Sequence, residues 1–286
     1  MTHQVETGKR IVVYYQSHHH DGALVSTREL LRRCPELTAV NVGAIHLNDP
    51  PGNITLNDDS HDDPCYDEVW ADLAEVQAAG GLVIGMLGGA AVGSYQRLDG
   101  TAFETYYPAL AEFVRQHRLD GLDLDIEEEM SLAGVVRLID RLHQDFGEDF
   151  VITMAPVATA LSGGGTMSGF DHEELYRMRG DAIAWMNAQF YCGWGSLETT
   201  AGYDAIMARG VLPASKVVAG TTTHPMHGAG YVDPLVLRET VATLSARYPG
   251  FGGVSSWEYF NSEPGGTLAP WEWAQAMAAS LAEPQL

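Results

Sequence analysis

Long apolar runs and paired cysteines are both missing from this chain of 286 residues. No stretch reaches the roughly 18 apolar residues that a membrane-spanning helix needs, so we expect no segment within a membrane. Three scattered cysteines (Cys34, Cys65 and Cys192) form no disulfide framework, and no CxxC pair indicates a zinc site. The first ten residues, MTHQVETGKR, lack the apolar segment of a secretion signal. The chain as written therefore favours the cytoplasm, whereas a signal removed in processing would place the protein outside the cell.

Basic residues are also scarce. The chain has 16 Lys and Arg against 38 Asp and Glu, which gives a formal net charge of −22 at pH 7. An acidic surface repels phosphate backbones and anionic lipid, so nucleic acid and membrane surfaces are excluded as favoured partners. A neutral sugar is not repelled. With 45% hydrophobic and 19% charged residues, the composition is that of a globular protein with a sizeable core.

Eight short β-branched or apolar runs alternate with segments of helical period along the chain. Strict alternation of this kind predicts parallel strands joined by right-handed helical crossovers. No GxGxxG fingerprint follows the first run and no Pro/Ser-rich linker divides the chain, so we predict one (β/α)8 barrel as a single catalytic domain over residues 1–286. The predicted strands are 11–16, 38–47, 81–87, 119–127, 150–158, 183–191, 216–222 and 251–259, and the clearest helices are 66–79, 103–118, 132–146, 234–247 and 270–281.

The fourth predicted strand, LDGLDLDIE, alternates acidic with apolar residues. Side chains of a strand point alternately to its two faces, so the leucines face the helices while Asp123, Asp125 and Glu127 point into the barrel. An acidic edge strand facing water is the alternative, but a solvated face accepts Lys, Thr or Ser equally well. Crowded, buried carboxyl groups have raised pKa values, and one of them can hold a proton near neutral pH as a general acid. Glu127, nearest the barrel mouth, is the natural candidate.

Asp120, Asp123, Asp125 and Glu127 together resemble the DxxDxDxE signature of glycoside hydrolase family 18, which comprises chitinases and endo-β-N-acetylglucosaminidases. The resemblance implies a retaining, substrate-assisted mechanism, in which the 2-acetamido oxygen of the sugar attacks the anomeric carbon through an oxazolinium intermediate. Glu127 would then protonate the leaving oxygen and later activate water. Asp125 would accept a hydrogen bond from the acetamide N–H, and Asp123 would support both acids.

Other strands carry residues that fit the same resemblance. The sixth strand alternates Asn187, Gln189 and Tyr191 with apolar residues, and Tyr191 stands where the family donates a hydrogen bond to the acetamide carbonyl. Trp257, in the eighth strand, matches the tryptophan that stacks on the sugar ring. The alternative for an isolated Tyr or Trp is a packed core residue. We predict that the substrate contacts are Trp257, Gln189, Asn187, Met154, Gly88, Gly89, Tyr14 and His18.

Three consecutive histidines, His18 to His20, follow the first strand and precede Asp21. Imidazole and carboxylate groups bind metal ions, but adjacent side chains point in different directions and rarely share one ion. A polar loop that lines the sugar groove is the favoured interpretation. We therefore predict no metal and no cofactor.

The segment 223–233, between the seventh strand and the next helix, is too short for the α+β insertion of many processive chitinases. A shallow groove suits a branched glycan or a non-processive chitinase. The segments SHHHDG, PGNITLND, GMLGGAAVGSY, APVATAL, QFYCGWG and SSWEYFN resemble the fungal and actinobacterial endo-β-N-acetylglucosaminidases. The leading prediction is a monomeric enzyme that hydrolyses the GlcNAc-β-1,4-GlcNAc bond in the chitobiose core of N-glycans on glycoproteins. Chitin oligosaccharides are the alternative substrate, and a catalytically inactive lectin is a minor alternative because the acid at Glu127 is retained.

Overall fold

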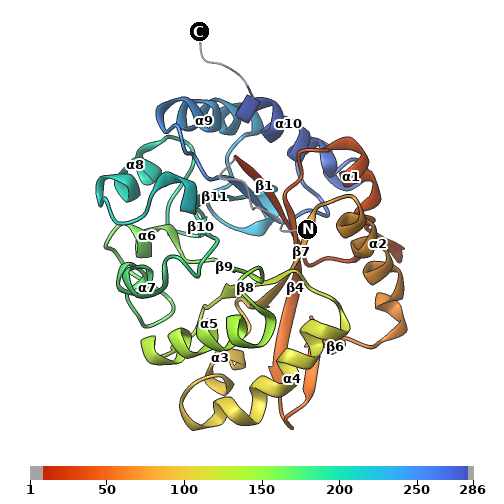
Figure 1. The fold of residues 1–286 in the computed structure, drawn as a ribbon. Helices are drawn as coiled ribbons and strands as arrows, with labels where there is room; N and C mark the ends of the chain where they lie inside the picture. The colour runs from red at the N-terminus through yellow and green to blue at the C-terminus, as the bar shows by residue number, and fades with distance from the viewer. Residues whose placement is uncertain (1–8, 283–286) are drawn as a thin grey trace.

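The computed structural model describes residues 9–282, and their strands close into a barrel (Figure 1). Closure follows from the pairing of β1 (Arg10–Tyr15) with both β12 (Gly253–Trp257) and β4 (Ala39–Asn48), all in parallel. The remaining barrel strands, in order from β4 round to β12, are β7 (Leu82–Gly88), β8 (Gly121–Asp125), β9 (Val151–Met154), β10 (Trp185–Gln189) and β11 (Val217–Thr222). The predicted (β/α)8 barrel is confirmed. Most of the polar amino-terminal segment lies outside the described residues, so the expectation about a secretion signal stays untested.

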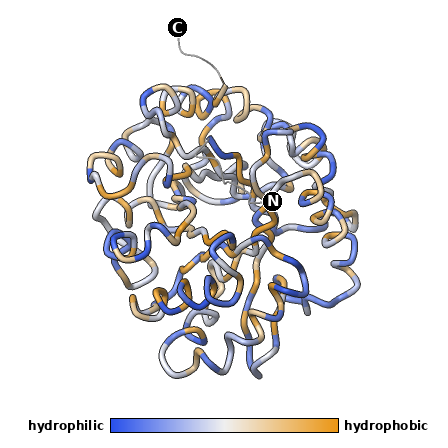
Figure 2. Tube along the Cα trace, in the orientation of Figure 1, coloured by the Kyte–Doolittle hydropathy of each residue, from blue (hydrophilic) through white to orange (hydrophobic). Residues whose placement is uncertain are grey.

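The helices surround the barrel and bury one face each, as α5 (Leu132–Phe146) illustrates. Its buried residues recur at the spacing of one helical face, and Ser131 caps its first turn by accepting a hydrogen bond from the Gly134 N–H at 3.0 Å. Hydrophilic and hydrophobic residues mix along each outer helix in Figure 2, as expected when one face is buried. The other helices are α1 (Arg28–Arg33), α2 (Asp67–Ala78), α3 (Ser94–Arg97), α4 (Phe103–Gln116), α6 (Ala158–Leu161), α7 (His172–Arg179), α8 (Ala201–Ala208), α9 (Pro234–Arg247) and α10 (Trp271–Ala282).

Two layers of side chains fill the space around and within the strands. The outward face of β8 places Leu122 and Leu124 in the large core shared with the helices, as predicted. Inside the barrel, a small apolar cluster around Trp185 and Val218 closes its amino-terminal end. The buried acids of β8 lie above this cluster, at the carboxyl ends of the strands. The barrel is therefore apolar at one end and polar at the end where barrel enzymes carry their chemistry.

Short additions to the barrel lie next to the polar end. β4 continues into an antiparallel hairpin with β5 (Asn53–Leu56) and β6 (Asp59–Ser60), and β2 (His19–His20) pairs with β3 (Ala23–Leu24). Only a single short helix, η4 (Pro225–His227), stands between β11 and α9, so the predicted absence of an α+β insertion is confirmed. Within residues 9–282, no helix has the length and apolar character needed to cross a bilayer.

Candidate active site

A cavity of about 390 Å³ opens at the carboxyl ends of the strands. Asp125 and Glu127 line it from one side, with Gln189 and Tyr191 from β10 and the segment after it, and Trp257 from β12. A larger hollow, of about 690 Å³, lies between α5 and α7 on the outside of the barrel and contains none of the acids of β8. The smaller cavity is therefore the candidate active site.

Asp123 is the deepest of the three acids and is completely buried. Its Oδ2 accepts a hydrogen bond from the Tyr14 hydroxyl at 2.6 Å, and its Oδ1 accepts from Thr153 Oγ1 at 2.5 Å and from Asn187 Nδ2 at 3.1 Å. Burial raises the pKa of Asp123, and these donors lower it in part. Three donors from three strands thus hold this carboxyl in one orientation.

Asp125 lies one step nearer the mouth and is also buried. Its Oδ1 accepts a hydrogen bond from Gln189 Nε2 at 3.2 Å. Burial, followed by the negative charges of Glu127 and Asp123, raises the pKa of Asp125 well above the ordinary value of an aspartate. A carboxyl in this environment carries a proton at pH values where an exposed aspartate is ionised.

Glu127 lies two residues beyond Asp125, just past the end of β8, and is half-buried in the cavity wall. Burial raises the pKa of Glu127, and a hydrogen bond from Gln189 Nε2 to its Oε1, at 3.1 Å, lowers it in part. The same Gln189 amide donates to the Ala155 carbonyl at 2.8 Å. One anchored amide therefore holds Asp125 and Glu127 together, and Glu127 is the acid best placed to meet a substrate.

Other parts of the cavity wall include a phenol, an indole ring and two glycines. Burial and the charges of Asp125 and Glu127 raise the pKa of Tyr191 well above that of free tyrosine, so its hydroxyl stays a hydrogen-bond donor. The Trp257 ring meets the Tyr14 ring edge to face at 5.7 Å between centroids. Gly88 has a φ of +92°, and a Cβ there would lie 2.5 Å from the Asp125 carbonyl oxygen, so only glycine fits.

Comparison with known proteins identifies the family of this barrel. The sequence profile of glycosyl hydrolases family 18 matches residues 10–229. The chain belongs to glycosyl hydrolase family 18. Its structure resembles a fungal endo-β-N-acetylglucosaminidase of that family with a TM-score of 0.91 and 43% sequence identity, over 96% of this chain and 98% of the other.

Chitinases are also among the relatives of this family 18 hydrolase. The chitinase ChiC from Aspergillus fumigatus matches with a TM-score of 0.87 and 48% identity, over 96% of this chain and 99% of the other. Endochitinase 4 of Metarhizium anisopliae is 24% identical over 199 residues, which are 57% of this chain and 70% of the relative. The protein is therefore a glycoside hydrolase. Its relatives include enzymes named as endo-β-N-acetylglucosaminidases and enzymes named as chitinases.

Four of the eight predicted substrate contacts of this family 18 enzyme line the cavity, and two lie beneath it. Gly88, Gly89, Gln189 and Trp257 are in the wall. Tyr14 and Asn187 were expected to touch sugar, but both are buried and hydrogen-bond to Asp123. They orient the deepest acid instead.

Two predicted contacts of the hydrolase lie outside the cavity. His18 is buried away from the cavity, where its ring packs edge-on against Tyr15 and Tyr66 and its Nε2 lies 3.1 Å from the Tyr15 carbonyl oxygen. Met154 is buried in the core shared with the helices, because its neighbour Thr153 takes the inward position opposite Asp123. The direction of the loop after β1 keeps His18 outside the site. The phase of β9 does the same for Met154.

Sequence reasoning missed several residues of the family 18 cavity. Met86 lies two residues before Gly88 on the same face of β7, and it forms an apolar cluster with Ala44, Ala155 and Tyr14 against Trp257. Its position in a strand of known phase was a usable signal. His46, Met167, Cys192, Trp194 and His227 also line the cavity. Apart from His46, near the end of β4, and His227, in η4, these come from loops, where no periodicity assigns a direction.

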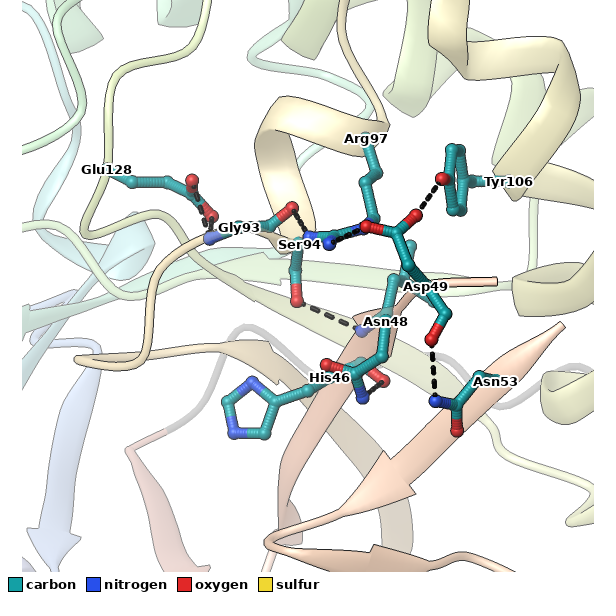
Figure 3. Close-up of polar contacts among 10 residues, drawn as sticks. His46, Asn48, Asp49, Asn53, Gly93, Ser94, Arg97, Tyr106 and Glu128 are labelled. Carbon is teal, nitrogen blue, oxygen red and sulfur yellow. Dashed lines mark hydrogen bonds and ion pairs between the residues drawn. The ribbon is translucent and has the colours of Figure 1, made fainter. Parts of the chain in front are cut away.

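Glu128, the residue after Glu127, fastens the loop that follows β7 (Figure 3). Its buried carboxylate accepts hydrogen bonds from the Gly93 N–H at 2.8 Å and the Tyr95 N–H at 2.9 Å. The Leu47 N–H donates to Ser94 Oγ at 3.0 Å, which ties the same loop to β4. Arg97 and Tyr106 both donate to Asp49 on the hairpin, as Figure 3 also shows. This hydrogen-bond network fixes the wall of the hydrolase cavity that contains Gly88 and Gly89.

Proposed function

We propose that this glycoside hydrolase cleaves the GlcNAc-β-1,4-GlcNAc bond in the chitobiose core of N-glycans by retaining, substrate-assisted catalysis. The observation that carries the mechanism is the arrangement of the acids. Glu127 is the acid at the mouth of the cavity, and its pKa is raised by burial. Asp125 is buried with a pKa raised well above normal, so it is a poor carboxylate nucleophile. A neighbouring acetamide supplies the nucleophile that the protein lacks.

In the proposed reaction, the Glu127 proton passes to the glycosidic oxygen as the bond to the anomeric carbon breaks. The acetamide oxygen of the substrate attacks that carbon from the opposite face and forms an oxazolinium ion. Asp125 accepts a hydrogen bond from the acetamide N–H, and the Tyr191 hydroxyl donates to the acetamide carbonyl. Water, deprotonated by Glu127, then attacks the anomeric carbon, so two inversions give retention.

A second hollow next to the catalytic cavity supports the proposal that the substrate is branched. It has a volume of about 390 Å³ and shares His46 and Ala91 with the catalytic cavity. Amide, hydroxyl and carboxyl groups line it, from residues Asn48, Asn53, Thr55, Asn57, Asp58 and Ser94. The network of Glu128 and Asp49 holds its two walls in place (Figure 3). A linear chain needs one groove, whereas a branched glycan has a second arm to bind.

Hydrolysis of chitin oligosaccharides is the second candidate, because the 48% identity to ChiC extends over 96% of this chain. Mass spectrometry of products from a high-mannose glycoprotein and a chitin hexamer, incubated in parallel, separates the two. A glycoprotein left with one GlcNAc on asparagine, beside an intact hexamer, is the expected result. A cut hexamer beside an untouched glycoprotein would overturn the proposal in favour of a chitinase. The Glu127→Gln variant, incubated identically, controls for contaminating glycosidases.

A further inference from the structure

Three side chains with metal-binding atoms meet on the outside of the barrel, away from the catalytic cavity. His61 and Asp62 directly follow β6, and His117 directly follows α4, which lies beside β6 in Figure 1. One ligand atom from each residue lies within 4.8 Å of the other two. Segments separated by more than fifty positions in sequence thus bring two imidazoles and a carboxylate to one point. The proposed glycosidase reaction uses none of them.

Two of the distances between these atoms suit a single ion. His61 Nδ1 lies 2.9 Å from His117 Nε2 and 3.3 Å from Asp62 Oδ1. If an ion lay about 2.0–2.1 Å from each ligand atom, the angle at the ion would be about 90° between the two nitrogens. It would be about 105° between His61 Nδ1 and the carboxylate oxygen. These angles correspond to adjacent positions around a four- to six-coordinate ion. The Asp62 side chain is 62% exposed, so water has access to the remaining positions.

Neighbouring aromatic and amide groups hold the three ligands. The His117 ring stacks on Trp70 at 3.9 Å between centroids, and the His61 ring meets Phe113 edge to face at 5.0 Å. Gln116 Nε2 donates to Asp62 Oδ1 at 2.5 Å. Supporting contacts of this kind fix ligand orientation in known metal sites. The ligands therefore lose little rotational freedom when an ion binds.

The chemical state of the ligands also favours a cation. At 2.9 Å, the contact between His61 Nδ1 and His117 Nε2 is a hydrogen bond, so at least one of the two rings offers a lone pair. In the absence of an ion, one ring donates a hydrogen bond to the other. An ion takes the place of that shared proton, which moves to the second nitrogen of the donating ring. Asp59 and Asp63 in the same segment, and the net charge of −22, attract divalent cations.

We propose that His61, Asp62 and His117 form a binding site for a divalent transition-metal ion of the Zn²⁺ or Ni²⁺ type. Two imidazoles and one carboxylate match the ligand preference of these ions, whereas Ca²⁺ and Mg²⁺ prefer ligand sets made of oxygen. The bound ion links the segment after β6 to the carboxyl end of α4. It stabilises the fold through that link and takes no part in sugar hydrolysis.

Isothermal titration of the full chain, prepared without a histidine tag, with Zn²⁺ tests the site. We expect one binding site in the native protein and a rise in Tm with Zn²⁺ concentration. His117→Phe retains the stacking on Trp70 but removes a ligand, and His61→Gln removes the other imidazole. Loss of an outer-shell partner alone costs about 10- to 100-fold in metal affinity, so we expect each ligand variant to bind more than about tenfold more weakly.

Two matched variants serve as controls. The His143 side chain is 12% exposed, as is that of His61, and its ring bonds to the Phe150 carbonyl, so His143→Gln should bind Zn²⁺ as the native protein does. His20→Gln tests the exposed part of the histidine run. Unchanged hydrolysis by every variant would show that each one folds. Native affinity in both ligand variants, loss of the site in His20→Gln, or no binding by the native protein would overturn the proposal.

Discussion

Replacement of Glu127 by glutamine isolates the proton that the proposed reaction needs. Glutamine has the same shape and keeps an oxygen that can accept the 3.1 Å hydrogen bond from Gln189, but it has no transferable proton. Removal of a general acid and base costs about 10²- to 10⁴-fold in rate, or about 3–5 kcal/mol of activation free energy. We expect the upper end of this range for a sugar leaving group, because its departing oxygen needs protonation most.

The assay compares two substrates whose leaving groups differ. Glu127→Gln and native enzyme are measured by kcat/KM on the natural glycan and on an aryl glycoside of N,N′-diacetylchitobiose, whose phenolate leaves without a proton. We expect the loss to be at least about tenfold smaller on the aryl glycoside, since only the hydrolytic half-reaction then needs Glu127. Equal losses on both substrates, or near-native hydrolysis of the glycan, would refute the assignment. In the native enzyme, the raised pKa of Glu127 predicts that activity falls as pH rises through that pKa.

Two further predictions concern the stability of the site. The folded-state pKa of Asp125 lies above its unfolded value of about 3.9, so the folded protein holds a proton that the unfolded chain releases, and stability falls as pH rises between the two values. Urea denaturation measures the free energy of unfolding at each pH. As pH rises above 4, this free energy should fall less in Asp125→Asn than in the native protein, and an equal fall in both would contradict the assignment. Glu128→Gln replaces a buried carboxyl group that accepts hydrogen bonds from two backbone N–H groups, and it should lower the free energy of unfolding by about 1.5–3 kcal/mol and raise KM. Replacement of the exposed neighbour, Glu129→Gln, should change neither quantity.

The barrel and its acids could be predicted because both depend on short periodicities. Each predicted strand contains or overlaps a strand of the structure, since a buried parallel strand is a continuous apolar run with turn residues at its ends. The acidic alternation in β8 likewise fixes which face each carboxyl takes. Five of the eight strand ends were predicted too far along the chain. β8, for example, ends at Asp125, although Glu127 keeps the expected direction and lines the cavity.

The misplaced residues are those whose direction does not follow from the alternation within one strand, because it depends on the register between strands or on a loop. Met154 pairs with Leu124, a residue already expected to face the helices, so the register between neighbouring strands was the missing information. His18 lies three residues beyond the end of β1, where alternation no longer applies, and its burial against Tyr66 depends on a segment about fifty residues away. Glu128 was passed over because its partners, the Gly93 and Tyr95 N–H groups, belong to backbone that no sequence pattern marks.

The different roles of the three acids follow from the number of hydrogen bonds that the protein donates to each carboxyl group. Asp123 receives hydrogen bonds from Tyr14, Thr153 and Asn187, which replace water around a buried carboxyl. Asp125 shares a single Gln189 amide with Glu127 and lies against both other acids, so it is the group that the protein stabilises least as an anion. A substrate acetamide N–H at Asp125 would supply the missing donor. Substrate binding would then favour the ionised form of Asp125 at the moment when positive charge develops on the oxazolinium ring, which couples recognition of the acetamido group to catalysis.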